Sequence, residues 1–340
     1  MTRLRHSRGS HRPLPSVQGA AEGRIAVFGP SPLLTVTIEP GTDRPDVHLH
    51  PGGQGFWVAR MVANLGVSVS LCCALGGEPG RVLRALIEPE RLTLRTVDAG
   101  TPNGVYVHDR RSGERVEIVS VESRPLERHA VDALYGLALS AGLEADITLI
   151  TGCQPDNVIN PDVYRRLCAD LRANGKPAIA DLTGAPLRAV LKGGVELLRL
   201  SGEELISERY ATSTDPADLV KAARKLQLAG ADHVLISRGP APALLIDDGG
   251  SSAQIELVPP MFEAQDRRGT GDSMFAATGV GLARGMSMID ALCLGMAAGA
   301  LNATRRGLGT GTREEIERLA RHVTANKTTA EPDCVFDPHP

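Results

Sequence analysis

Short apolar runs alternate with longer amphipathic stretches along most of the chain. Six runs are continuously apolar, as expected for strands covered on both faces: residues 24–29, 69–75, 147–152, 177–182, 195–200 and 233–239. Segments of helical periodicity lie between and after them: 55–65, 79–88, 127–142, 161–174, 215–229, 271–284 and 287–303. This alternation predicts an α/β protein with a mostly parallel central sheet between two layers of helices.

Two segments break this rhythm, because apolar and polar residues alternate in them. They are residues 34–50 and 93–121, and the second contains the hairpin pattern YVHDRRSGERVEIV with its turn at Arg111–Gly113. Strands with one wet face predict a small antiparallel sheet outside the main one. We expect this sheet to form a lid over a cleft, built from about residues 34–52 and 95–121.

Both ends of the chain are polar and contain proline. Residues 1–23 carry four arginines and lack an apolar core, so we expect a disordered tail rather than a secretory signal or an arm that binds nucleic acid. We expect a second loose tail over residues 323–340. A single domain at residues 24–322 remains, which is long enough to bury one large core.

Charge and cysteine content restrict the partners and the compartment. The 340 residues include 37 basic and 40 acidic ones, so no net positive field attracts nucleic acid or an anionic membrane. No apolar stretch reaches the roughly 20 residues that a transmembrane helix needs. The six cysteines form no Cys-x-x-Cys pair and mostly lie in apolar runs, which favours a reduced, cytoplasmic protein.

A glycine-rich turn before an apolar helix carries the candidate chemistry. Gly269, Thr270 and Gly271 lead into this helix, whose first backbone N–H groups and dipole would form an anion pocket. Asp272 follows beside the pocket, where a carboxylate can accept the proton of an alcohol during phosphoryl transfer. The structural alternative is an acidic residue that the helix dipole alone favours in the first turn.

This tract resembles the C-terminal signature of the PfkB, or ribokinase-like, carbohydrate kinases. Their other signature, a Gly-Gly element before a helix, resembles residues 51–66. The likeness covers about residues 24–322 in the order and spacing of the family, and the chain is most similar to the branch of 1-phosphofructokinase and tagatose-6-phosphate kinase. Further segments that resemble the family pattern are residues 146–152, 181–184, 199–205, 237–239 and 297–309.

The resemblance implies a three-layer α/β/α ribokinase-like fold and an ATP-dependent phosphotransferase that acts on a hydroxyl group of a sugar or sugar phosphate. Asp272 would be the general base, the N–H groups of residues 269–271 the anion hole, and Glu204 would position Mg²⁺. The implied ATP site comprises Ser201, Ser237, Gly239, Leu301 and Arg305. The implied substrate site comprises Thr35, Gly52, Gly53, Gln54 and Trp57. A homodimer formed through the lid is a further implication.

Departures from the family pattern concentrate on the acceptor side. Thr35 stands where the family has an aspartate, Gln54 where it has a lysine, Trp57 where it has an asparagine, and Pro102 where it has an arginine. A sugar phosphate needs fixed cations, so the loss of two of them predicts that phosphorylated sugars are poor acceptors. Four arginines are candidates to replace the two missing positive charges: Arg60, Arg110, Arg111 and Arg267.

The residues on the nucleotide side match the family pattern more closely than those on the acceptor side. Ser201 replaces an asparagine, but Glu204, Asp272 and the glycines before Asp272 are retained. The main alternative function is a catalytically idle ligand-binding or regulatory protein whose acceptor site has drifted. Because an idle site has no need for a base or a metal-positioning carboxylate, the retained residues favour an active kinase.

Other functions fit the sequence less well. The spacing Gly53-x-Gly55 is similar to part of a dinucleotide-binding fingerprint, but no buried parallel strand precedes it. A G-x-x-x-x-G-K-[ST] run is absent, which disfavours a P-loop kinase. His48 and His50 share one face of a strand, but they lack the further ligands that a metal site requires.

Overall fold

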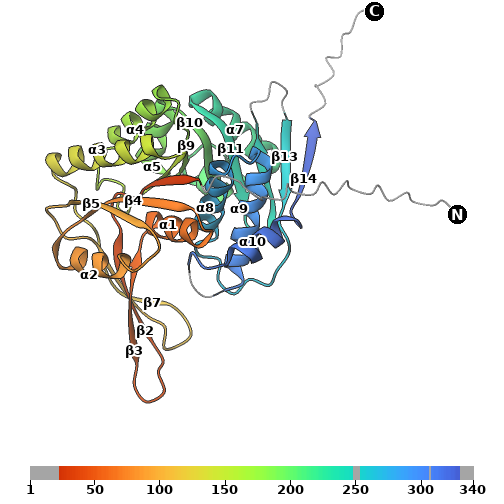
Figure 1. Ribbon diagram of the computed structural model, residues 1–340. Coiled ribbons are helices and arrows are strands. Elements are labelled where there is room, and N and C mark those ends of the chain that lie inside the picture. The colour runs from red at the N-terminus through yellow and green to blue at the C-terminus, as the bar shows by residue number, and fades with distance from the viewer. Residues whose placement is uncertain (1–22, 248–252, 306–307, 330–340) are drawn as a thin grey trace, which may run out of the picture.

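The computed structural model describes residues 23–247, 253–305 and 308–329, and it contains two separate sheets (Figure 1). The larger sheet has ten strands. In chain order these are β1 (Arg24–Phe28), β4 (Ser68–Leu75), β5 (Thr93–Asp98), β8 (Ile147–Thr151), β9 (Ala178–Asp181), β10 (Val195–Ser201), β11 (Ala231–Arg238), β12 (Ala241–Ile246), β13 (Ala253–Val258) and β14 (Thr324–Thr329). Their spatial order is β14-β13-β12-β11-β10-β9-β8-β1-β4-β5. Neighbours from β5 to β11 pair in parallel, and β12, β13 and β14 extend the sheet by antiparallel pairing.

Successive residues of the buried strands face opposite sides of this sheet. In β1, Ile25 and Val27 belong to one apolar cluster and Ala26 and Phe28 to the other, because side chains alternate along a strand. The first face is covered by α1 (Gln54–Asn64), α2 (Gly77–Ile87), α8 (Thr270–Ala283), α9 (Met288–Ala303) and α10 (Arg313–Ala320). The second is covered by α3 (Arg128–Glu144), α4 (Asp162–Ala173), α5 (Gly184–Gly193), α6 (Gly202–Ser207) and α7 (Pro216–Ala229). The predicted three-layer α/β/α fold is therefore confirmed.

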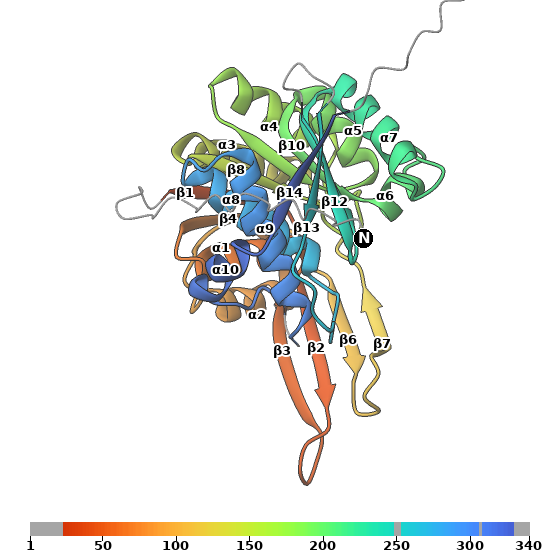
Figure 2. The ribbon, with the colours of Figure 1, turned by 90° about the vertical axis from the view of Figure 1, so that its right-hand side faces the viewer.

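The small sheet extends away from the main body (Figure 2). It contains β2 (Leu33–Glu39), β3 (Asp46–Gly52), β6 (Val105–Asp109) and β7 (Val116–Val121), in the order β3-β2-β6-β7. The hairpin between β6 and β7 is antiparallel, as predicted, and its turn includes Gly113 at a φ of 86°. The central pair β2–β6 is parallel, so the expectation of a fully antiparallel lid is wrong. Main-domain segments separate β2 from β6 in the chain, and such distant strands are free to pair in either direction.

Two predicted boundaries need correction. Residues 95–98 were expected in the lid, but they belong to β5, which pairs with β4 at the edge of the main sheet. The C-terminal tail was expected to be loose from residue 323, but residues 324–329 form β14, which pairs with β13. Backbone pairing, rather than an apolar pattern, places this polar strand. The predicted N-terminal tail, apart from Gly23, and residues 330–340 lie outside the described residues.

A buried asparagine fixes the lid to the main domain where the two sheets meet. Asn103 is 4% exposed, and its Nδ2 atom donates to the carbonyl oxygens of Pro32 and Ala74, each at 3.0 Å. Its Oδ1 atom accepts a hydrogen bond of 2.8 Å from the backbone N–H of Gly76. One side chain therefore joins the connection before β2, the end of β4 and the start of α2.

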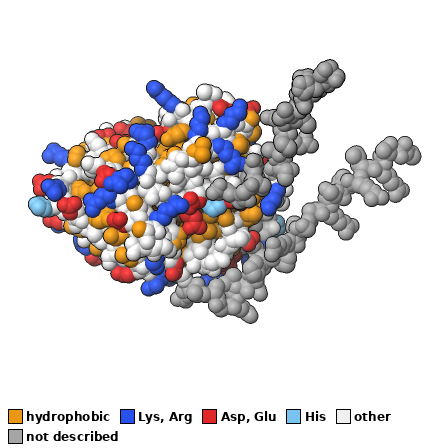
Figure 3. Space-filling view, turned by 90° about the horizontal axis from the view of Figure 1, so that it is seen from above, with side chains coloured by type: hydrophobic (Ala, Val, Ile, Leu, Met, Phe, Trp, Pro, Cys, Tyr) orange, Lys and Arg blue, Asp and Glu red, His pale blue; other side chains and the backbone are white. Residues whose placement is uncertain are grey.

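Three features bear on the surroundings of the protein. Acidic and basic side chains are interspersed on the face opposite the lid (Figure 3). The cysteines of the described chain are free, and all but the partly exposed Cys153 are buried, in keeping with their positions in apolar runs. Within the described ranges, none of the helices combines the length and apolarity needed to cross a bilayer.

Candidate active site

The candidate site lies at the carboxyl ends of the parallel strands. Gly29, Gly152 and Asp181 follow or end β1, β8 and β9, and all three line a cavity of about 380 Å³ together with Asp272 and Glu204. Strand β1 lies between β4 and β8, so the chain leaves it in one direction and later returns on the other side. Parallel sheets bind ligands in the crevice at such a switch point.

Helix α8 begins at this cavity with a left-handed glycine. Gly269 is the N-cap residue with a φ of 66°, and a Cβ atom there would lie 2.5 Å from the side chain of Leu308. Asn302 holds the turn, because its Nδ2 atom donates to the carbonyl oxygen of Arg268 at 2.8 Å. The first N–H groups of a helix have no carbonyl partner within it, and they point along the positive end of its dipole. Residues 269–271 thus have the backbone form of an anion hole.

Asp272 occupies the first turn of α8 and faces the cavity. Burial and the neighbouring Asp181 raise the pKa of its carboxyl group to about 7, although Arg199 and a hydrogen bond from Gln54 act in the opposite direction. A general base works best when its pKa lies near the working pH. The buried position therefore suits this carboxylate to accept a proton from an alcohol.

Arg199 places a positive charge among the carboxylates of Asp181, Glu204 and Asp272, and its side chain is only 12% exposed. Its Nη1 atom lies 3.3 Å from Oδ2 of Asp181, and its Nη2 atom donates to Oγ of Ser237 at 2.6 Å. Burial opposes its charge, but the carboxylates of Asp181 and Glu204 raise its pKa overall. A Cβ atom on Gly271 would lie 2.8 Å from either Nη atom, so the guanidinium group lies directly against the start of α8.

Gln54 connects Asp272 to the end of β8. Its Oε1 atom accepts a hydrogen bond of 3.1 Å from the backbone N–H of Gly152. Its side chain also hydrogen-bonds to both Asp181 and Asp272, and each bond lowers the pKa of the carboxyl group concerned. The resemblance implied an acceptor-binding role for Gln54, and the residue lines the smaller cavity beside the carboxylates of Asp181 and Asp272. A lysine at this position would present a positive charge to them instead.

The residues predicted to bind the nucleotide divide into two groups. Ser201 and Ser237 are register partners at the ends of β10 and β11, next to Arg199, and Gly239 follows in a turn with a φ of 58°. Leu301 and Arg305 lie elsewhere: the Leu301 side chain is buried in the core, and Arg305 forms an ion pair with Glu315 at 2.8 Å. The first group therefore lies at the ends of β10 and β11, outside the lining of the cavity, and the side chains of the second group are engaged in other contacts.

Glu204 is the candidate for positioning Mg²⁺. Its Oε2 atom accepts a hydrogen bond of 2.6 Å from the N–H of Ser201 in a capping box that begins α6, while the residue still lines the cavity. Among the described residues, no group of three or more His, Cys, Asp or Glu side chains is arranged to hold a metal ion. Mg²⁺ at nucleotide sites uses one or two carboxylates with waters and phosphates, so a single Glu204 fits this mode of binding.

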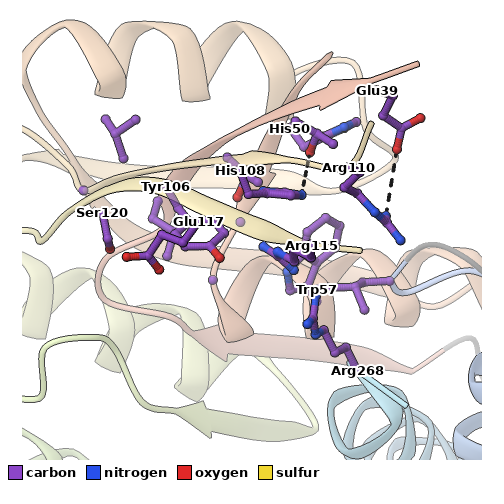
Figure 4. Close-up of a pocket in the computed structure, with 18 of the residues that line it drawn as sticks. Glu39, His50, Trp57, Tyr106, His108, Arg110, Arg115, Glu117, Ser120 and Arg268 are labelled. Atoms are coloured by element: carbon purple, nitrogen blue, oxygen red, sulfur yellow. Dashed lines mark hydrogen bonds and ion pairs between the residues drawn. The ribbon is translucent and has the colours of Figure 1, made fainter. Parts of the chain in front are cut away.

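The predicted acceptor residues come from the lid and from the main domain beside it. Thr35, Gly52, Gly53 and Trp57 line a second cavity of about 1120 Å³, which shares Gly53 and Trp57 with the smaller one (Figure 4). Gly52 must lack a side chain here, because a Cβ atom would lie 2.6 Å from Oγ1 of Thr35. The two cavities are therefore adjacent parts of one cleft between the lid and the main domain.

Several site residues were not predicted from the sequence. Asp181 and Arg199 are register partners on β9 and β10 and become neighbours only through sheet pairing. Arg115 and Arg268 line the large cavity from two distant segments. One available indication was the alternation of Arg199 with Ser201, which places both side chains on the same face of β10.

Comparison with known proteins gives consistent matches over most of the chain. The sequence profile described as pfkB family carbohydrate kinase matches residues 33–315. The chain is 30% identical over 318 residues to ATP-dependent 6-phosphofructokinase isozyme 2 of Escherichia coli strain K12, a match that covers 86% of this chain and 99% of the relative. It is 25% identical over 312 residues to the 1-phosphofructokinase of the same strain, with 86% and 97% covered.

Solved structures agree with this likeness. Phosphofructokinase-2 from Escherichia coli in complex with potassium gives a TM-score of 0.77 at 28% identity, with 88% of this chain and 99% of that chain covered. Arabidopsis thaliana ribokinase complexed with ribose and ATP gives a TM-score of 0.70 at 20% identity, with 88% and 98% covered. The second likeness concerns the fold alone.

Proposed function

Because the chain belongs to the pfkB family of carbohydrate kinases, we propose that it transfers the γ-phosphoryl group of ATP to a hydroxyl group of a sugar or sugar phosphate. The observation that carries this proposal is the position of Asp272. It lies in the first turn of α8, directly after the glycine-built N-terminus, and it faces the cavity. A base and an anion hole are the two protein groups that phosphoryl transfer to an alcohol requires.

In the proposed reaction, the acceptor hydroxyl gives its proton to the Asp272 carboxylate. The oxygen then forms a bond to the γ-phosphorus atom, the bond from phosphorus to the bridging oxygen of ADP breaks, and ADP leaves with that electron pair. The N–H groups of residues 269–271 stabilise the charge on the transferred group. A pKa of about 7 keeps a large fraction of Asp272 ionised at neutral pH while it remains basic enough to accept the proton.

Arg199 assists by adding positive charge beside the anion hole. Its guanidinium group lies against Gly271 and is held in place by Asp181 and Ser237. A fixed cation costs little reorganisation when charge develops in a transition state. Glu204 would hold Mg²⁺ through water, and the ion would neutralise phosphate charge on the nucleotide.

The lid supports a second part of the proposal, a homodimer. Its strands expose large apolar side chains that a single chain leaves uncovered: Val47, Leu49, Val116, Ile118 and Val119. These residues lie on β3 and β7, the two edge strands of the small sheet, and exposed apolar surface is typical of contact sites between proteins. One solved relative is described as the tetrameric inhibited form of phosphofructokinase-2 from Escherichia coli. We therefore place the contact between two copies of this chain at the lid.

A screen for ATP consumption tests the proposed activity. Purified protein is incubated with ATP, Mg²⁺ and separate sugars, sugar phosphates or nucleosides, and ADP and the phosphorylated product are both measured. We expect turnover with at least one carbohydrate and almost no ADP in its absence. ATP binding without turnover of any acceptor would instead support the idle binding protein.

A further inference from the structure

We propose that Arg115 and Arg268 bind one anionic group of the acceptor between the lid and the main domain, so that phosphorylated sugars are preferred over neutral ones. This inference rests on the proposed function and specifies its substrate class. It also reverses the expectation, drawn from Gln54 and Pro102, that phosphorylated sugars are poor acceptors. The cations missing from the expected positions are supplied from two other places.

The two arginines approach each other from different bodies of the protein. Arg115 lies just before β7 in the lid, and Arg268 lies in the main domain just before Gly269 of the anion hole. Both line the large cavity, and Figure 4 shows their side chains converging beside Trp57. Arg268 is close enough to contribute to lowering the pKa of Arg115. The cleft is therefore spanned by two like charges.

Neither charge is neutralised within the protein. Among the described residues, no carboxylate forms an ion pair with either guanidinium group. Arg110 and Arg111 differ, since Arg110 pairs with Glu39 at 3.9 Å and Arg111 with Asp109 at 2.6 Å.

Arg115 is also partly removed from water. It stacks on the ring of Tyr106 at 4.7 Å, and its Nε atom is buried without a hydrogen-bond partner in the described structure. Burial, followed by the charges of Arg268 and Arg110, lowers its pKa against the opposing effect of Tyr106. A partly desolvated cation that repels its neighbours is stabilised by an anion and destabilised by a neutral ligand.

The acceptor is the ligand that fits this position. The large cavity joins the catalytic one at Leu33, Gly53 and Trp57, so one molecule can place a hydroxyl group near Asp272 and an anionic group between the arginines. The predicted nucleotide residues Ser201 and Ser237 line neither the large nor the small cavity. Ser237 accepts a hydrogen bond from Arg199, and Ser201 caps α6. Arginine binds phosphate through paired N–H donors, so a sugar phosphate matches the site.

An anion between these residues would also couple binding to closure. With a neutral acceptor, the repulsion between Arg115 and Arg268 opposes the approach of the lid to the main domain. A phosphate dianion would neutralise both charges and draw the two bodies together, which excludes water from the transfer step. The preference for a phosphorylated acceptor should therefore be expressed in turnover as well as in binding.

Direct binding tests the inference without relying on activity. Trp57 is the single tryptophan of the chain and lines both cavities, so its fluorescence reports on the cleft. We would titrate inorganic phosphate at constant ionic strength into the wild type, Arg115→Gln, Arg268→Gln and Arg111→Gln. We expect a saturable change in the wild type and in Arg111→Gln, whose charge Asp109 already neutralises. In the other two variants, affinity should fall on the order of 10- to 100-fold. Equal affinity in all four proteins would overturn the inference.

Turnover provides the second measurement. For whichever sugar the wild type phosphorylates, kcat/KM is compared between its monophosphate and its unphosphorylated form. We expect the monophosphate to be preferred, and each of Arg115→Gln and Arg268→Gln to reduce that preference on the order of 10-fold or more. A wild type that prefers the neutral sugar would refute the inference but leave the proposed kinase function standing. Phosphate binding that depends on both arginines, without turnover of any sugar, would refute the function alone.

Discussion

The guanidinium group of Arg199 forms a largely buried ion pair with the carboxylate of Asp181, with 3.3 Å between Nη1 and Oδ2. The two residues have opposite effects on Asp272: the charge of Asp181 raises the pKa of its carboxyl group, and the charge of Arg199 lowers it. Burial raises that pKa further. The balance of these three effects gives a carboxyl group with a pKa near neutral pH, so the ion pair adjusts the pKa of Asp272.

Replacement of the proposed base is the simplest test of the proposed mechanism. Asp272→Asn keeps the size of the side chain but removes its ability to accept a proton, so we expect kcat to fall by about 10²–10⁴-fold. The affinity for ATP, measured by calorimetry, should change little because the anion hole is formed by backbone groups. Near-normal turnover in this variant would exclude Asp272 as the base.

The pH dependence of turnover should report the same balance. The base must be ionised, so kcat/KM should rise with pH through a midpoint at about 7. Arg199→Gln removes a charge that lowers the pKa of Asp272, so the midpoint should move to higher pH. Asp181→Asn removes a charge that raises it, so the midpoint should move to lower pH. Shifts of both variants in the same direction would contradict this account.

Gly271→Ala tests whether Arg199 must lie against the proposed anion hole. The new Cβ atom would lie 2.8 Å from the Nη atoms of Arg199, so the guanidinium group must move relative to Asp181 and Ser237, which hold it. We expect a lower melting temperature, because a buried ion pair is disturbed, and a loss in kcat/KM on the order of 10²-fold, because the cation beside the transferred group is displaced. Gly136→Ala on α3 is the matched control, since a Cβ atom there meets nothing within 4 Å. Full activity of Gly271→Ala would show that the position of Arg199 is unimportant.

Asn103 should be important for stability. Asn103→Ala leaves two carbonyl oxygens and one N–H group without their partner at the junction of lid and main domain. We expect the free energy of unfolding, measured by urea denaturation, to fall by about 2–4 kcal/mol. Asn174→Ala, at an exposed helix end, should change it by no more than about 0.5 kcal/mol. Equal effects of the two substitutions would contradict the role assigned to Asn103.

The oligomeric state tests the proposed lid contact. Leu49 and Ile118 are 45% and 54% exposed, and a glutamate at either position would place a charge in the dimer interface. Light scattering should show a dimer for the wild type and a monomer for Leu49→Glu and Ile118→Glu. Leu228→Glu is the control, because Leu228 is 90% exposed on α7, outside the lid. A dimer that survives both lid substitutions would exclude this interface.

The sequence alone determined the three-layer fold and the candidate base. Buried strands and amphipathic helices have different apolar periods, so each predicted strand and helix is present with small shifts at its ends. Gly269, Gly271 and Asp272 are close in the chain, so one local pattern specifies both the helix start and its carboxylate. Short or polar elements such as α6 and β14 were missed because neither has a strong apolar period.

Only the tertiary structure decided which side chains from distant segments meet. Asp181 faces Arg199 because β9 and β10 pair in one register, and a shift of one residue would turn them to opposite faces. Arg115 and Arg268 are brought together by the approach of the lid to the main domain, which no local pattern encodes. Periodicity specifies which face of an element is buried, whereas sheet register and the packing of the two bodies determine what that face contacts.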